Sequence, residues 1–252
     1  MTATAESDAR PRSPENAEAG PSKQCPTAAD AVSLLNAGLG VVAFCSAVEL
    51  RPADRTGLAR IAMLVLACVV CDLVDGAVAR RFGASRWGAT LDSAADAISF
   101  GAVPAMLVLS QAEGSAIPTA YRLAALVFGI GAMLRLVRFA RRPRRAGAFE
   151  GLPTTMAAVN VVAVMQLHLP DVPMFAAVLL IAGLMVSRLP FPALRGTSVA
   201  VASLAVLLSV KILLPAAVHH PLPTAVRACA LLVIAVVCGA PLWSLCARRR
   251  KP

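Results

Sequence analysis

The chain has 252 residues, of which 58% are hydrophobic and 15% are charged, and its formal net charge is +10. A soluble domain of this length could not bury so much apolar surface, so the composition predicts an integral membrane protein. One tyrosine and two tryptophans offer few rings for base stacking. The positive charge therefore indicates anionic lipid rather than nucleic acid as its partner.

The first 28 residues are rich in alanine, serine, proline and charged residues without apolar periodicity, which predicts a disordered cytoplasmic tail. Apolar segments then recur along the chain, and most approach the roughly 20 residues that cross a bilayer. They cover 29–49, 57–79, 89–111, 119–140, 152–168, 173–187, 197–216 and 223–246. This pattern predicts an all-α, polytopic helical bundle of about eight transmembrane helices. The membrane domain would span 29–246, with a basic cytoplasmic tail at 247–252.

Positive residues gather in every second connection and at the end of the chain. They are Arg80, Arg81 and Arg86; Arg141, Arg142, Arg144 and Arg145; Arg188 and Arg195; and Arg248, Arg249, Arg250 and Lys251. The alternate connections near 112–118, 169–172 and 217–222 carry no lysine or arginine, and only Arg51 and Arg55 depart from the pattern. Because positive loops favour the cytoplasmic side, we expect a multi-pass protein of the cell membrane with both termini in the cytoplasm.

Four aspartates stand at the facing ends of the second and third apolar segments. Asp72 and Asp75 are three residues apart and Asp92 and Asp96 are four apart, so each pair shares a helix face. The short connection between the segments predicts an antiparallel hairpin, in which all four carboxylates converge near the cytoplasmic interface. Ionisable groups in apolar helices usually face a partner, a cavity or an ion. Divalent cations would relieve the repulsion among the four acids.

Two alternative roles for the four acids differ from metal binding. Helix capping or pairing with arginines accounts for one or two aspartates, but not for four on two helix faces. An ion-coupled transporter is the second alternative, although its acids would lie near the bilayer midplane. Gly76, Ala79 and Gly88 would let a bulky ligand approach the backbone, and Arg80 can reach a phosphate. The cluster therefore suits two divalent metals acting on a phosphate group.

The pattern D-x-x-D-G-x-x-A-R, a spacer, and then G-x-x-x-D-x-x-x-D resembles the signature of the CDP-alcohol phosphotransferases. These membrane enzymes move a phosphatidyl or phospho-alcohol group from a CDP-linked donor to an alcohol and release CMP. Every fixed position is present over 72–96, but the seven residues between Arg80 and Gly88 are one fewer than the family normally has. The resemblance implies a six-helix catalytic core with additional helices, a homodimer, and a cofactor of two Mg²⁺ or Mn²⁺ ions.

The same resemblance implies roles for individual residues. The metal ligands would be the four aspartates Asp72, Asp75, Asp92 and Asp96. Asp96 would also act as the general base on the attacking hydroxyl, which requires metal charge and a dry site to be effective. The CDP group would lie against residues at the adjoining helix ends, namely Asp72, Gly76, Ala79, Arg80 and Gly88.

Four further stretches resemble the phosphatidylserine synthase branch of this family, and they follow the order of that branch. They lie at 33–40, 92–104, 135–153 and 187–192. The second reads D-S-x-A-D-x-x-S-F-G-x-x-P, and the third contains R-L-x-R-F and then F-x-G-L-P. The branch implies CDP-diacylglycerol and L-serine as substrates within a lipid bilayer. Glycerol phosphate, inositol phosphate or another alcohol is the alternative acceptor.

Two arginines are candidates for contact with the acceptor or the diphosphate. Arg135 and Arg138 are three residues apart at the cytoplasmic end of the segment 119–140. Guanidinium groups bind carboxylate and phosphate through paired hydrogen bonds. The alternative is that both arginines anchor the helix to lipid headgroups.

Overall fold

The computed structural model describes residues 27–51, 54–83, 85–141, 148–188 and 190–192. Its helical elements, in chain order, are α1 (Ala28–Val48), α2 (Arg55–Phe82), α3 (Gly88–Asp96), the π-helix η1 (Ala97–Ala102), α4 (Val103–Ser110), the 3-10 helix η2 (Gln111–Gly114), α5 (Pro118–Arg141), α6 (Thr154–Gln166) and α7 (Asp171–Val186). Strand β1 (Ala148–Glu150) pairs antiparallel with β2 (Pro190–Pro192) and joins the end of α5 to the end of α7.

Caps fix where the first two helices begin. The Asp30 carboxylate accepts a hydrogen bond from the Thr27 backbone N–H at 2.6 Å. The Asp54 carboxylate accepts one from the Gly57 N–H at 2.9 Å. Both bonds satisfy polar groups that the first turn of a helix leaves without an intrahelical partner. α2 ends before Gly83, whose φ of 88° suits glycine, and the helix hairpin can turn there toward α3.

The third long helix changes its winding in the middle. α3, η1, α4 and η2 run on as one helical segment, Gly88–Gly114, with the π-helix at its centre. In η1 the Ser99 hydroxyl donates to the Asn36 side-chain oxygen on α1 at 3.0 Å. Gly40 lies against the same hydroxyl, where a Cβ atom would clash with it. The π-turn therefore lies at a close contact between α1 and the third helix, directly after the aspartates of α3.

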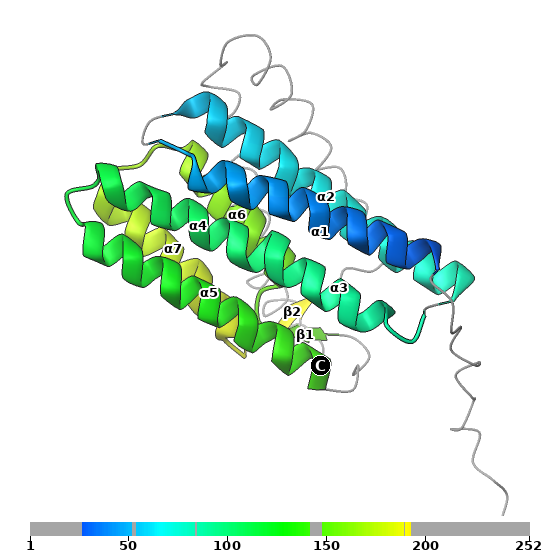
Figure 1. Cartoon of the computed structure of the whole chain (residues 1–252). Helices are drawn as coiled ribbons and strands as arrows, with labels where there is room; N and C mark the ends of the chain where they lie inside the picture. The colour runs from blue at the N-terminus through cyan, green and yellow to red at the C-terminus, as the bar shows by residue number, and fades with distance from the viewer. Residues whose placement is uncertain (1–26, 52–53, 84, 142–147, 189, 193–252) are drawn as a thin grey trace, which may run out of the picture.

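The long helices stack beside one another, and the short ones lie behind them. Figure 1 shows α1 along α2, and the α3–α4 segment between α1 and α5. α6 is the inner helix, because its residues 157–166 are all buried and it contacts α2, α4 and α7. A helix that is apolar on every side belongs in an interior. Its first turn is thereby held against α2, where Asp72 lies.

The described helices are those of a membrane protein. Four segments are long and apolar enough to cross a bilayer: α1, α2, the segment Gly88–Gly114, and α5. Large apolar side chains lie exposed along them, including Leu35 at 56% and Leu126 at 59%. Such surfaces suit contact with lipid chains, where helices satisfy all their own backbone groups. The predicted helical membrane fold is confirmed to this extent.

The first six apolar segments all coincide with helices, but α6 and α7 have only 13 and 16 residues. The predicted spans 197–216 and 223–246 lie outside the described residues, as do residues 1–26 and the tail 247–252. A total of about eight transmembrane helices, the tails and the domain boundaries therefore stay predictions. The short strand pair was not predicted from the sequence; its strands have only three residues each.

Candidate active site

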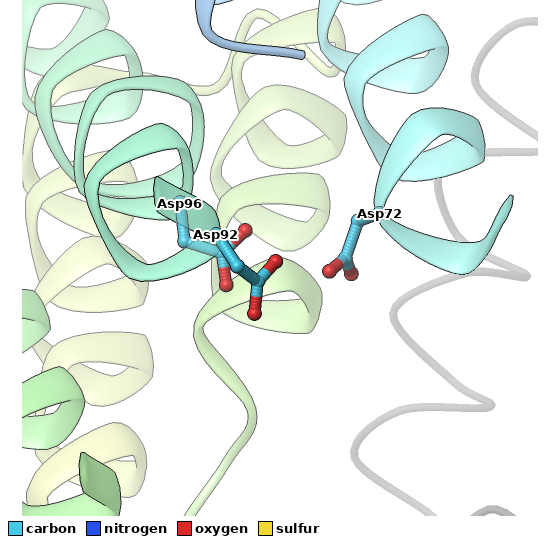
Figure 2. A group of neighbouring side chains, drawn as sticks. All are labelled: Asp72, Asp92 and Asp96. Carbon is cyan, nitrogen blue, oxygen red and sulfur yellow. The ribbon is translucent and has the colours of Figure 1, made fainter. Parts of the chain in front are cut away.

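Three of the four predicted aspartates meet between two helices. Asp72 comes from α2, and Asp92 and Asp96 come from successive turns of α3. One carboxylate oxygen from each lies within 4.8 Å of the other two, and all three residues are half-buried. Figure 2 shows the Asp72 carboxylate facing those of Asp92 and Asp96 across the gap between the helices. We call these three residues the aspartate cluster.

Asp75 lies on the same helix as Asp72 but turns toward a different neighbour. It is 5% exposed, and its Oδ2 accepts a hydrogen bond from the Ser33 hydroxyl of α1 at 2.8 Å. It is not among the residues whose oxygens gather within 4.8 Å of one another. Its predicted role as a metal ligand stays a prediction, and what the geometry gives it directly is a contact that ties α1 to α2.

The aspartate cluster has the chemistry of a site for a divalent cation. Carboxylate oxygens are the ligands that Mg²⁺ and Mn²⁺ prefer. The Oδ1 atom of Asp96 is buried and accepts no hydrogen bond in the described part of the chain. A buried carboxylate oxygen without a donor is costly, and a bound cation would satisfy it. The residues present therefore fit the predicted metal ions.

A pair of threonines connects this cluster to an arginine. Thr154 and Thr155 form the first turn of α6, and we call them the threonine pair. The Thr155 hydroxyl donates to Asp72 Oδ2 at 3.3 Å. The Thr154 hydroxyl accepts a hydrogen bond from Arg135 Nη1 at 2.6 Å. Adjacent residues of one helix turn thus touch an aspartate of α2 on one side and an arginine of α5 on the other.

Arg135 is a cation held close to the acids. Its charge interacts with Asp96 and Asp72, and with Arg138 on the next turn of α5. Its Nε atom is buried and has no hydrogen-bond partner within the described ranges. A guanidinium in this position keeps donor capacity for an anionic ligand that arrives beside the aspartate cluster.

Arg138 is directed elsewhere, onto the end of α7. It donates from Nη1 to the Val186 carbonyl at 3.1 Å and from Nη2 to the Ser187 carbonyl at 3.4 Å. The Gly151 backbone fits beside this contact with a φ of 79°, and a Cβ atom there would lie 2.6 Å from the Met185 carbonyl oxygen. The predicted G-L-P element is therefore a tight turn against α7, immediately before the threonine pair.

The predicted CDP-binding residues lie at the same end of the helix hairpin. Gly76 and Ala79 are half-buried on α2, and Arg80 is exposed in its last turn. A Cβ atom on Gly76 would lie 3.4 Å from Arg80 Nη1. Gly88, also half-buried, begins α3. Ser85 lies in the connection between α2 and α3, and its hydroxyl donates a hydrogen bond to the Asp30 carboxylate of α1 at 2.9 Å.

Sequence reasoning missed three hydroxyl residues at this site: Ser33, Thr154 and Thr155. Each donates to or accepts from a residue that was predicted as functional. A signal was present for the threonine pair, since it follows the G-L-P element directly. Ser33 begins the stretch 33–40 that resembles the phosphatidylserine synthase branch, but nothing in the sequence assigned it a contact, because a serine in an apolar helix usually bonds its own backbone.

Comparison with known proteins finds a family whose match includes these residues. A family model described as CDP-alcohol phosphatidyltransferase matches residues 26–189, which is more than half of the 252-residue chain. The match includes the aspartate cluster, Asp75, the threonine pair and both arginines of α5.

Several curated relatives carry the name CDP-diacylglycerol–serine O-phosphatidyltransferase. The protein from Mycobacterium leprae is 37% identical over 114 residues, which cover 42% of this chain and 37% of the relative. That from Methanocaldococcus jannaschii is 33% identical over 130 residues, or 51% and 62% of the two chains.

A third relative of that name, from Bacillus subtilis, is 35% identical over 128 residues, which cover 48% of this chain and 68% of the relative. The chain thus spans less than two thirds of the M. leprae and M. jannaschii proteins. The family model does not depend on these partial alignments: it matches residues 26–189, which contain every position of the aspartate signature. The chain belongs to the CDP-alcohol phosphatidyltransferase family.

Proposed function

We propose that the protein transfers the phosphatidyl group of CDP-diacylglycerol to L-serine, yielding phosphatidylserine and CMP. The observation that carries this proposal is the aspartate cluster, with its three carboxylates from two helices gathered in a membrane protein of this family. The acceptor is taken from the relatives, because those from M. leprae and M. jannaschii are named serine O-phosphatidyltransferases. The alternative is the same chemistry with another alcohol as acceptor.

In this proposal Asp72, Asp92 and Asp96 hold two divalent ions, Mg²⁺ or Mn²⁺, with Asp75 as a further ligand. When bound, the ions neutralise the diphosphate oxygens and orient the attacking group. The Thr155 hydroxyl keeps the Asp72 carboxylate in place, as its hydrogen bond at 3.3 Å indicates. Ligating carboxylates are commonly fixed by such outer partners.

Asp96 is the proposed general base. Its carboxylate lies among those of Asp72 and Asp92, so one oxygen can ligate a metal ion while the other takes a proton. The serine hydroxyl oxygen forms a bond to the phosphorus that carries diacylglycerol. The bond from that phosphorus to the bridging oxygen breaks, and CMP leaves with the electron pair. The serine proton passes to Asp96 and from there to water.

The substrates would lie on either side of this centre. Gly76, Ala79 and Gly88 leave space for the CDP group, and the exposed Arg80 can reach its diphosphate. Arg135 is the better placed of the two α5 arginines to bind the serine carboxylate, since its charge acts on Asp96 and its Nε is buried without a partner among the described residues.

We also propose that this end of the bundle faces the cytoplasm in the cell membrane, and that the protein forms a homodimer. Basic residues occupy the last turns of both α2 and α5, beside the aspartate cluster. Such clusters favour the cytoplasmic side. The homodimer rests on family resemblance alone.

The decisive experiment uses the purified full chain with CDP-diacylglycerol and Mn²⁺, and measures CMP release. L-serine, glycerol 3-phosphate, inositol phosphate or no acceptor is added in parallel reactions. We expect release that depends on L-serine. Release only with another alcohol would overturn the acceptor while keeping the chemistry. No release with any acceptor, from folded protein loaded with metal, would overturn the transferase function and favour ion transport.

A further inference from the structure

A pocket of about 390 Å³ lies where the last turns of α5 meet the end of α7. Among the described residues it is lined by Leu134, Arg135, Val137, Arg138, Arg141 and Val186. No residue of the aspartate cluster lines it. Its volume lies in the range of sites that hold small ligands.

The lining combines two kinds of chemistry. Of the described lining residues, one half are arginines and the other half aliphatic, and none of them carries a carboxylate. Guanidinium groups such as those of Arg138 and Arg141 favour an anion with several oxygens, such as a phosphate. The aliphatic half favours a ligand that carries apolar atoms next to that anion. A phosphate ester of a lipid has both parts.

Hydrogen bonds within the protein hold two of the pocket's arginines, Arg138 and Arg135, in place. Arg138 bonds to the carbonyls of Val186 and Ser187, at 3.1 and 3.4 Å, so its guanidinium stays at the seam between α5 and α7. Arg135 is held by its hydrogen bond to the Thr154 hydroxyl of α6. A ligand therefore meets guanidinium groups that are already positioned, which lowers the entropy lost on binding.

The pocket also faces the surroundings in which a lipid would arrive. Leu134 is 56% exposed, Val137 46% and Val186 42%, on helices of a membrane protein. Arg141 is exposed at the final residue of α5. Apolar side chains reaching toward the bilayer, with arginines just beyond them, match the order of acyl chain and phosphate in a lipid leaflet.

We propose that this pocket binds an anionic phospholipid, with its phosphate against Arg138 and Arg141 and the start of its chains against Leu134 and Val137. The pocket shares Arg135 with the proposed serine site, but it contains none of the aspartates, its proposed phosphate contacts are Arg138 and Arg141, and lipid binding there requires no turnover. The inference therefore stands or falls independently of the proposed transferase function.

The test is native mass spectrometry of the purified full chain in detergent, with titrated dioleoyl phosphatidylglycerol. Dioleoyl phosphatidylcholine and inorganic phosphate serve as the comparison ligands. Arg141→Gln removes one cation from the mouth of the pocket. Arg122→Gln is the matched control, because Arg122 is also exposed on α5 but lies toward its opposite end.

We expect Arg141→Gln to weaken phosphatidylglycerol binding about fivefold, the effect of one cation at an anionic surface, while Arg122→Gln leaves it unchanged. Val137→Trp fills the pocket without changing charge and should also reduce binding. Equal binding by all three variants would overturn the proposal. So would equal binding of phosphatidylcholine, or displacement of the lipid by millimolar inorganic phosphate, which would identify a site for the anion alone.

Discussion

Asp96 combines a buried oxygen with a position among other carboxylates. Asp96→Asn keeps the shape of the side chain but removes its basic oxygen. We expect CMP release with L-serine to fall by about 10²- to 10⁴-fold, the usual contribution of a general base. CDP-diacylglycerol binding should persist, because the other carboxylates are unchanged. Glu113→Gln, at an exposed residue of η2, is the control, and a variant at Asp96 that retains a tenth of the activity would exclude it as the base.

The threonine pair allows the two sides of the site to be separated. Thr155 donates to Asp72, whereas Thr154 accepts from Arg135. Because outer partners of metal ligands are worth about 10- to 100-fold in metal affinity, Thr155→Val should raise the Mn²⁺ concentration needed for half-maximal activity by that factor. Thr154→Val should instead raise the KM for L-serine.

Steady-state titrations of Mn²⁺ and of L-serine measure both effects. Thr155→Ser restores the hydroxyl and should recover most of the metal affinity. Thr119→Val, at an exposed threonine near the start of α5, should change neither parameter. If Thr154→Val and Thr155→Val each changed both the Mn²⁺ requirement and the KM for L-serine to the same extent, the threonine pair would stabilise the fold rather than position the metal site and the serine site separately.

At the scale of elements, the contact between α1 and η1 is a close one. Gly40 touches the Ser99 side chain, whereas a Cβ atom on Gly38 of the same helix would meet nothing within 4 Å. Gly40→Ala should therefore destabilise the fold by about 1–3 kcal/mol through overpacking. Gly38→Ala should be neutral or slightly stabilising, since alanine favours helix. Thermal unfolding in detergent distinguishes the pair, and equal midpoints would contradict the observed contact.

The helices themselves were predictable to a useful degree. The first six apolar segments match helices within a few residues, because long apolar runs specify a helix through local sequence alone. The π-turn in η1 was not predicted from the sequence; its Ser99 contacts Asn36 of α1, far away in the chain. Nor was the short pairing of β1 with β2, which joins segments far apart in the chain.

At the scale of the whole molecule, metal binding should stabilise the bundle, because it would relieve repulsion between α2 and α3. Mn²⁺ at about 100 times its Kd should add about 2.7 kcal/mol of stability, measured as a rise in the unfolding midpoint that EDTA reverses. Asp72→Asn should diminish the rise, while Glu113→Gln should keep it. An equal rise in both variants would show that Mn²⁺ binds elsewhere. This measurement needs no substrate, so it tests the site apart from the reaction.

The aspartate cluster shows where prediction from sequence reached its limit. Spacing placed Asp72 and Asp75 on one broad face, but residues three apart differ by about 60° around a helix axis. That angle is enough for Asp72 to face α3 while Asp75 faces Ser33 of α1. The sequence likewise predicted one shared role for Arg135 and Arg138. In the structure Arg135 interacts with Asp96 and Asp72, whereas Arg138 donates to a carbonyl at the end of α7.

The sequence by itself determined that this is a helical membrane protein, where its first helices run, and that it carries the aspartate signature of its family. These properties follow from composition, apolar run length and residue spacing, which are local. Only the tertiary structure decided which aspartates meet, that the threonine pair joins Asp72 to Arg135, and that arginines and aliphatic residues form a pocket beside α7. These depend on how helices distant in the chain pack together, and packing selects one of several faces that the local pattern leaves equally available.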